Sequence, residues 1–302
     1  MNTYPFTASQ VQNASATDVL AFIKSPTLLA RRLGEILTAQ QFIGNFLFSG
    51  RYAIQGGAIA VPSNEKFRTQ RTAETVNAGA EYKLTPLSAE EWEIYTSQKR
   101  GLATEVTDEE VTRSLRQPLD DALTFLQTEL VFDANDIALG VAQSAITQSV
   151  PGGAWTNGKQ ILKDAERIKA RARALKLGIS IDTVVLSGEQ YAEVLPELLD
   201  ILPDNSDLAI TGSFPTVAGI TWVSADDDDF TDPMFLDRRI FGGIARERIA
   251  SPEYVAVGTD TGVEIASIRE PKADKTRIQA RNPHVPVVRV PQAGFRLTGT
   301  GA

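Results

Sequence analysis

The sequence predicts an α+β fold, in which helices and strands fall into separate stretches of the chain. Three observations predict it. Residues 107–145 keep a helical apolar period, residues 51–86 and 253–299 are rich in β-forming runs, and residues 159–201 carry the pattern of helix, strand and helix. We therefore expect the first and last parts of the chain to share one sheet, with the long helix between them.

Composition places the chain among ordinary globular proteins. It has 302 residues, of which 42% are hydrophobic and 23% are charged, enough for one large or two smaller domains. Cysteine is absent, which fits a reducing cytoplasm and excludes thiolate nucleophiles and ligands. The first residues lack the pattern of a signal peptide, and no apolar run reaches the ~20 residues of a membrane span. We therefore expect no association with membranes.

The N-terminal third predicts elements that need support from outside the subunit. Residues 1 to about 30 are small and polar and predict an extended arm, and residues 26–48 add a short amphipathic helix. Two β-leaning runs, 52–61 and 67–76, flank the turn-forming sequence PSNEK and predict a long, mostly polar hairpin. An isolated hairpin is marginally stable, so we expect it to lie on a neighbouring subunit. The basic residues expected at that contact are Arg51, Lys66, Arg68 and Arg71.

The longest predicted element starts at Thr107, which forms a capping box with Glu110. Apolar residues then recur every three or four positions from Val111 to Ala145. At ~1.5 Å per residue this helix spans roughly 50 Å or more. Pro118 should kink it or divide it in two. The element is expected to act as a girder across the subunit.

A second helix is predicted over residues 159–177, with a C-cap glycine at position 178. Its outer face carries Lys163, Arg167 and Arg171 in one row. One interpretation is a solvated surface. The other is weak, salt-sensitive contact with the phosphates of double-stranded DNA, because the net charge of −8 disfavours tight binding to nucleic acid.

Motifs that could carry chemistry are weak. The sequence GAWTNGKQ at residues 153–160 departs from a phosphate loop at Gln160, where a serine or threonine should bind magnesium, and we interpret it as a connector between two helices. The run Asp226–Asp229 is interpreted as a solvated acidic loop. The only histidine, His284, is expected to be an ordinary surface residue, and Ser187 an ordinary turn residue. We therefore expect no enzyme, no cofactor and no metal site.

Five segments, taken in chain order, resemble one family. Residues 73–86 resemble the segment that leaves an extended loop, residues 103–145 a spine helix, and residues 181–195 a strand, turn and helix. Residues 217–229 resemble a later strand and loop, and residues 292–299 a closing strand. The family is that of the major capsid proteins of tailed double-stranded DNA phages, with the Hong Kong 97-type fold, and the siphophage members are the most similar.

The resemblance implies a domain organisation. It consists of an N-terminal arm and short helix (1–50), an E-loop hairpin (51–80), a P-domain with the spine helix (81–152), an A-domain (153–270) and a returning P-domain strand (271–302). Some family members carry a long helical scaffold segment ahead of the arm. We therefore expect either that such a segment is removed or that a separate scaffolding protein assists assembly.

The resemblance also implies a function: self-assembly as hexamers and pentamers into an icosahedral shell that encloses the double-stranded DNA genome. The implied partners are other copies of the chain, a scaffolding protein and a portal, and the implied location is the virion capsid, assembled in the bacterial host cytoplasm. One alternative is an encapsulin-like nanocompartment, which has the same fold and encloses cargo enzymes. The other is a metal-dependent cytoplasmic enzyme that uses Asp226–Asp229.

Overall fold

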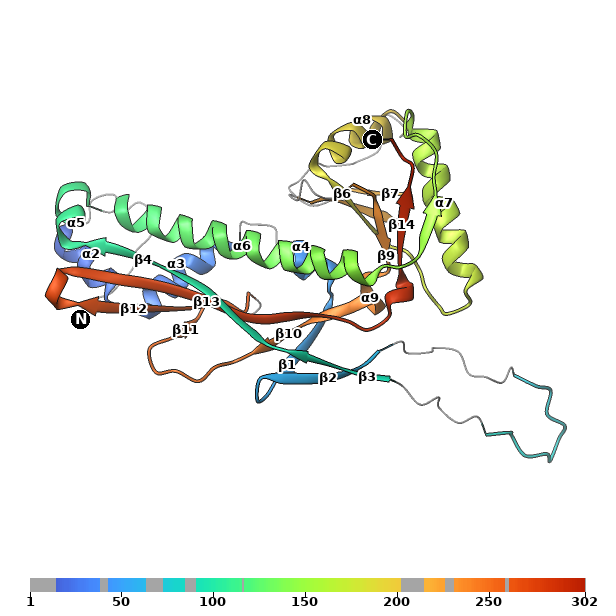
Figure 1. The fold of residues 1–302 in the computed structure, drawn as a ribbon, viewed down its shortest axis with the longest axis horizontal. Helices are drawn as coiled ribbons and strands as arrows, with labels where there is room; N and C mark the ends of the chain where they lie inside the picture. Colours follow the sequence, from blue (N-terminus) through green and yellow to red (C-terminus); the bar gives the residue numbers. More distant parts are fainter. Residues whose placement is uncertain are drawn as a thin grey trace.

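The computed structural model describes residues 15–38, 43–63, 73–84, 91–115, 117–201, 215–225, 231–258 and 261–301. In Figure 1 these residues form an elongated part with a long helix, a second part at one end of it, and a ribbon that projects from the same end. Each of the two larger parts is built on a six-stranded sheet, and the ribbon has two strands. This arrangement is the α+β architecture that the sequence predicts.

The first sheet joins segments from both ends of the chain. Its longest strand, β13, pairs antiparallel with β4, β10 and β12, and β1 pairs parallel with β10. The expectation that the first and last parts share a sheet is therefore confirmed. The six strands are β1 (Gly50–Ile54), β4 (Gln98–Thr107), β10 (Gly242–Glu247), β11 (Val255–Ala256), β12 (Glu264–Glu270) and β13 (Lys275–Val288).

The long helix lies along the first sheet (Figure 1) and is divided in two near Pro118, as predicted. Helix α5 (Asp108–Ser114) begins with the expected capping box, and helix α6 (Gln117–Ala145) follows a break at Leu115, whose φ is 54°. The predicted apolar series is buried as far as Ala134, apart from the exposed Leu115. Beyond Ala134 the series rotates away from the buried face. Its residues recur on average more than 3.6 positions apart, and 3.6 residues make one turn of an α-helix. Ala138, Leu139 and Ala142 are buried there instead.

The N-terminal segment is helical over residues 16–23, where an extended arm was expected, and residues 26–38 form the predicted amphipathic helix, while residues 1–14 lie outside the described ranges. Helices α2 (Ala16–Ile23), α3 (Pro26–Thr38) and α4 (Ile43–Leu47) precede the first strand. Ser15 caps α2 through a capping box with Asp18. The apolar residues of α2 and α3 belong to the core between α6 and the first sheet, whereas those of α4 belong to the larger core that includes Ala138. Burial in these tertiary contacts stabilises helices that the polar composition did not predict. The prediction of little core was wrong for residues 16–30.

The second sheet carries the strand–turn–helix that the sequence predicts. Strand β6 is fully buried, and helices α7 and α8 pack against each other beside it. The predicted helices and the later strand expected within residues 217–229 are therefore confirmed, and Gly178 has the positive φ of a C-cap glycine. The elements are β5 (Ser149–Pro151), α7 (Gly158–Ala174), β6 (Thr183–Ser187), α8 (Gly188–Ile201), β7 (Thr216–Val217), β8 (Ile220–Ala225), β9 (Met234–Leu236) and β14 (Gly294–Thr298).

The boundaries between the two parts differ from those expected. The chain returns to the first sheet after the short helix α9 (Arg238–Phe241), so β10, β11 and β12 do not belong with residues 153–237. Strand β14 was expected to close the first sheet, but it lies between β5 and β9 in the second. A β-rich run signals a strand without signalling its partner, which explains both errors.

His284 was expected on the surface in an irregular stretch, and this prediction was wrong. It lies within β13 and is buried, with 6% of its surface exposed. Pro283 and Pro286 flank it and favoured a loop, because proline removes a ladder hydrogen bond. Both prolines nevertheless hold regular register positions, opposite Lys99 of β4 and Ile244 of β10.

Candidate assembly surface

The projecting ribbon is paired differently from the predicted hairpin. Strand β2 (Ala58–Ser63) pairs antiparallel with β3 (Glu91–Thr96), not with residues 67–76. Of that second run, residues 73–76 form no strand and residues 67–72 lie outside the described ranges. Residues 73–84 lie far from both sheets, at the outer end of the projection (Figure 1). The loop is therefore longer than expected and returns through the strand that contains Trp92.

The ribbon exposes apolar side chains, although a mostly polar hairpin was expected. Half of the large hydrophobic side chains that are exposed within the described ranges lie on it. Scattered exposed apolar residues need no explanation, but a group on one projection indicates a contact surface. The four are Tyr82, Leu84, Trp92 and Ile94, with 81%, 89%, 63% and 71% of their surfaces exposed.

The base of the ribbon is fixed to the first sheet. The hydroxyl of Tyr95 lies 3.2 Å from the carbonyl oxygen of Val288 in β13 and 2.9 Å from a carboxylate oxygen of Glu93. Burial and the neighbouring Glu93 raise the pKa of Tyr95 to about 12, so this hydroxyl keeps its proton at neutral pH. Ile54 and Val61 add a small apolar cluster with the sheet. A base that is fixed to the sheet therefore carries a projection on which Trp92 and Ile94 remain largely exposed.

Of the four predicted basic contact residues, the structure describes only Arg51. Arg51 lies on β1, and its guanidinium donates hydrogen bonds to the carbonyl oxygens of Asn45, Phe48 and Gly50. It thereby closes the end of α4 within its own chain. The other three residues, Lys66, Arg68 and Arg71, lie outside the ranges that the structure describes.

The predicted basic row lies on the outer face of α7. Lys163, Arg167 and Arg171 are all exposed, as expected. Arg167 donates a hydrogen bond to the carbonyl oxygen of Pro151 at 2.9 Å, and neither Lys163 nor Arg171 has a partner among the residues that the structure describes. The row therefore presents three positive charges, of which one is also used to hold β5.

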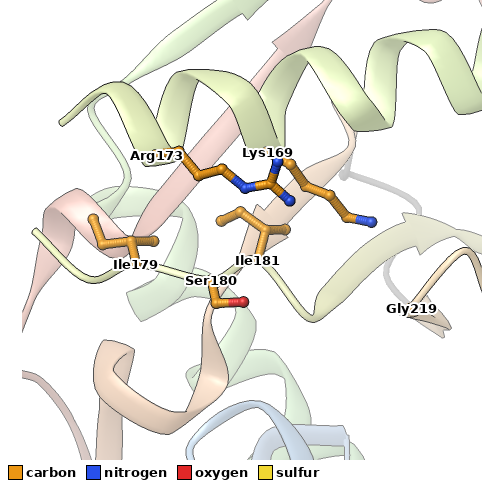
Figure 2. Close-up of a pocket in the computed structure, with 6 residues that line it drawn as sticks. All are labelled: Lys169, Arg173, Ile179, Ser180, Ile181 and Gly219. Carbon is orange, nitrogen blue, oxygen red and sulfur yellow. The ribbon is translucent and has the colours of Figure 1, made fainter. Parts of the chain in front are cut away.

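A shallow pocket of about 120 Å³ opens beside this row, between α7 and the turn that joins β7 to β8. Figure 2 shows the side chains of Lys169 and Arg173 on the same side of the helix, with Arg173 over Ile181 and Lys169 extending toward the turn at Gly219, where it donates a hydrogen bond to the carbonyl oxygen of Ala218 at 2.6 Å. Lys169 also contacts Glu166 at 2.8 Å. Two cationic groups and a hydroxyl suit an oxyanion, and the i, i+4 spacing of the two basic residues is the sequence signal for them.

The glycine-rich loop before α7 directs its donors inward. The buried carboxylate of Asp164 accepts hydrogen bonds from the backbone N–H of Gly153, from Nε1 of Trp155 and from Nε2 of Gln160, at 3.0, 3.2 and 3.0 Å. A short strand, β5, precedes the loop, where a helix was expected. The donors that would hold a phosphate are therefore occupied by the protein's own carboxylate.

Other classes of site find no support within the described ranges. Those residues include no group of three or more histidine, aspartate or glutamate side chains that could hold a metal. The acidic run Asp226–Asp229 lies outside them. None of the helices that the structure describes combines the length and the hydropathy of a membrane span.

Comparisons with known proteins agree with the geometry. The model of a family described as phage capsid protein matches residues 90–297. The capsid structure of cyanophage P-SCSP1u superposes with a TM-score of 0.55 at 9% identity, covering 83% of this chain and 86% of that one. The mature capsid of bacteriophage PhiM1 gives 0.55 at 11% identity, with 87% and 88% covered.

An encapsulin also shares the architecture. The SrpI encapsulin of Synechococcus elongatus superposes with a TM-score of 0.50 at 12% identity, covering 98% of this chain and 95% of that one. No curated protein sequence matches the chain. At such low identities the structural likenesses establish the fold, whereas the family match rests on the sequence itself.

Proposed function

Because the chain belongs to the phage capsid protein family and has the Hong Kong 97-type fold of a major capsid protein, we propose that it forms a shell of hexamers and pentamers that encloses a double-stranded DNA genome. Such shells form from one chain in repeated, heterologous contacts. The role is structural. Assembly takes place in the host cytoplasm, with a scaffolding protein and a portal as further partners.

The observation that carries the proposal is the ribbon with its fixed base and uncovered apolar side chains. Trp92 and Ile94 gain little from exposure to water, and burial of an apolar side chain contributes ~1.5–3 kcal/mol. A neighbouring copy can cover them, and the basic residues Lys66, Arg68 and Arg71 of the connecting loop fit the same contact. Because each subunit makes several such contacts, individually weak ones add up to a stable shell.

The row formed by Lys163, Arg167 and Arg171 fits the side of the subunit that meets the packaged DNA. Three cations neutralise at most a few phosphates, so the contact is non-specific and sensitive to salt. The chain's net charge of −8 keeps it weak, which lets the genome enter and leave. The pocket beside Lys169 and Arg173 adds two positive groups to the same helix.

Changing all three row residues to alanine tests the DNA contact. Binding of duplex DNA to the assembled shell protein should weaken, and the slope of log K against log salt should fall by up to ~0.9 for each lost phosphate contact. The matched control removes three exposed basic residues from other elements, Arg31, Lys272 and Arg277. Equal weakening by the control variant would show that net charge, rather than this row, governs the contact.

Electron microscopy of the purified full-length chain, with and without a scaffolding protein, tests the shell itself. A variant in which Asn-Gly replaces residues 64–90 closes the β2–β3 hairpin directly. We expect it to fold with an unchanged circular dichroism spectrum and unfolding midpoint, and to form no stable shells. Normal shells from this variant would contradict the role of the ribbon.

The contents of the particles separate a phage capsid from an encapsulin-like compartment, which has the same architecture. Particles purified from the native source should contain DNA that resists nuclease until the shell is opened. A single enriched cargo enzyme in place of DNA would favour the compartment. The match of residues 90–297 to the phage capsid family supports the first outcome.

A further inference from the structure

A small polar cavity lies at the junction of α4, α6, β10 and β13. Its volume is about 10 Å³, close to the space that one water molecule needs. Asn135 of α6 and Asn282 and His284 of β13 line it, and the exposed fractions of these side chains are 2%, 4% and 6%. Arg246 of β10 completes the wall as its positively charged member.

Three buried polar atoms of Asn135, Asn282 and His284 have no hydrogen-bond partner within the described ranges. They are Nδ2 of Asn135, Oδ1 of Asn282 and Nε2 of His284. Buried polar atoms are rarely left unpaired, because each costs ~1–3 kcal/mol. Their gathering around one cavity therefore indicates a shared partner.

The hydrogen-bonding role of each atom follows from its other contacts. Oδ1 of Asn135 accepts the backbone N–H of Gly44, so its free Nδ2 is a donor. Nδ1 of His284 lies 3.0 Å from the carbonyl oxygen of Asn282, which can only accept. The neutral imidazole therefore carries its proton on Nδ1, and Nε2 is an acceptor, as is Oδ1 of Asn282. These three side chains thus offer one donor and two acceptors to the cavity.

We propose that this cavity is the binding site of one internal water molecule, which joins α6 to β13 and must reverse its hydrogen bond to His284 when the imidazole takes up a proton. The water accepts a hydrogen bond from Asn135 and donates its two protons to Asn282 and His284. This satisfies all three atoms with the three bonds that a buried water typically makes.

The sensitivity to acid follows from the groups that face the imidazole. Arg246 lies directly opposite His284 in the β10–β13 register. Arg100 of β4 and Asp133 of α6 are also near, but they form an ion pair with each other at 2.7 Å. The other polar residues at the site, Asn45 of α4, Gln98 of β4 and Thr261, do not titrate.

Protonation therefore places a second cation beside Arg246 and turns Nε2 from an acceptor into a donor. The water can no longer donate to Nε2 and must turn to accept its proton instead, while it still accepts from Asn135 and donates to Asn282. Burial lowers the pKa of His284 below its ordinary value of 6.5, in agreement with this arrangement. A folded-state pKa below the unfolded one stabilises the fold above pH 6.5, and this stabilisation disappears as the pH falls through the folded pKa.

Because His284 is the only histidine, its titration can be measured without assignment. The ¹³Cε1 signal of labelled histidine in the full-length chain, in solution or in assembled particles, should titrate below pH 6.5. The unfolding equilibrium constant should rise by up to ~tenfold per pH unit below that value. The variant His284→Gln keeps polar atoms without titrating, and it should lose this component of the slope.

The water itself is tested by a high-resolution structure at pH 8, which should show density within hydrogen-bond distance of the three atoms. Direct hydrogen bonds among the three side chains, with no density between them, would overturn the site. A folded-state pKa of 6.5 or higher for His284 would overturn the acid sensitivity, whether or not His284→Gln folds. An unchanged slope in a folded His284→Gln would do the same.

Discussion

Arg281 and Glu264 face each other across β13 and β12 and form a buried ion pair, with a guanidinium nitrogen 2.6 Å from a carboxylate oxygen. Only 5% and 10% of the two side chains are exposed. The guanidinium also donates a hydrogen bond to the carbonyl oxygen of Ile249 and lies over the ring of Tyr254, 3.6 Å from its centroid. The pair thereby ties the segment before β11 to the middle of the first sheet.

Removing one member of this pair should leave the other charge buried without a counterion. We expect Glu264→Ala to lower the free energy of unfolding by about 3–5 kcal/mol. The double variant Glu264→Leu/Arg281→Met should recover most of that loss, because apolar replacements remove the cost of burying both charges. Urea unfolding of the single and double variants measures the difference, and a double variant no better than the single one would contradict the argument.

Asp164 should be the most sensitive position of α7. Its carboxylate accepts three hydrogen bonds from the loop and the first turn before it, so Asp164→Ala leaves those donors unpaired. The expected loss in the free energy of unfolding is on the order of 3 kcal/mol. Glu166→Ala is the matched control, since this exposed acid on the same helix makes only a surface ion pair, worth about 1 kcal/mol or less. Thermal unfolding compares the two, and equal losses would refute the assignment.

Trp92 and Ile94 should matter for assembly and not for folding. Both are exposed in the subunit, so Trp92→Ser/Ile94→Ser removes no contact of the fold. The unfolding midpoint should change little, while shells should form only at higher protein concentration, if at all. Sedimentation velocity and electron microscopy follow assembly, and denaturant unfolding supplies the control. Normal shells at the wild-type concentration would mean that a neighbouring copy does not cover these side chains.

The pair of Asp108 and Arg269 should make the start of α5 sensitive to acid. Hydrogen bonds from Arg269 hold the pKa of Asp108 below its ordinary value of 3.8. Because the folded-state pKa is the lower one, the carboxylate stabilises the fold above pH 3.8 and loses that effect as the pH falls through the folded value. Asp108→Asn and Arg269→Met should both reduce the pH dependence of the free energy of unfolding below pH 3.8. Acid unfolding followed by circular dichroism measures it, and a wild-type slope in either variant would contradict the assignment.

Elements whose signal is local could be predicted from the sequence. The spine helix, the basic helix α7 and the β6–α8 unit follow from helical period, capping residues and a short apolar run. The break near Pro118 follows from the chemistry of proline. The exposed row beginning at Lys163 could be predicted for the same reason, because the apolar stripe of a helix fixes its opposite face.

Elements that depend on distant partners could not be predicted in the same way. The strand that pairs with β2 begins 33 residues after the start of β2, at Glu91, and β14 crosses to the second sheet. Strand composition carries no information on such pairings. The buried position of His284 was hidden by its flanking prolines, so the polar cavity could not be found before the fold was known. The apolar face of the ribbon was missed because Trp92 and Ile94 were assigned outside the hairpin.

Leu115 offers a test of the break between α5 and α6. Its φ of 54° and ψ of −111° are costly for any residue with a Cβ atom, and 44% of its side chain is exposed. Leu115→Gly should therefore relieve strain that exceeds the added entropy of glycine in the unfolded chain, and raise the free energy of unfolding by on the order of 1 kcal/mol. Leu115→Ala is the matched control, because it removes the same exposed side chain but keeps the Cβ atom and the strain. Differential scanning calorimetry should show a higher melting temperature for glycine than for alanine. If alanine matched or exceeded glycine, the break would not be strained, and the two helices would be separated by Pro118 alone.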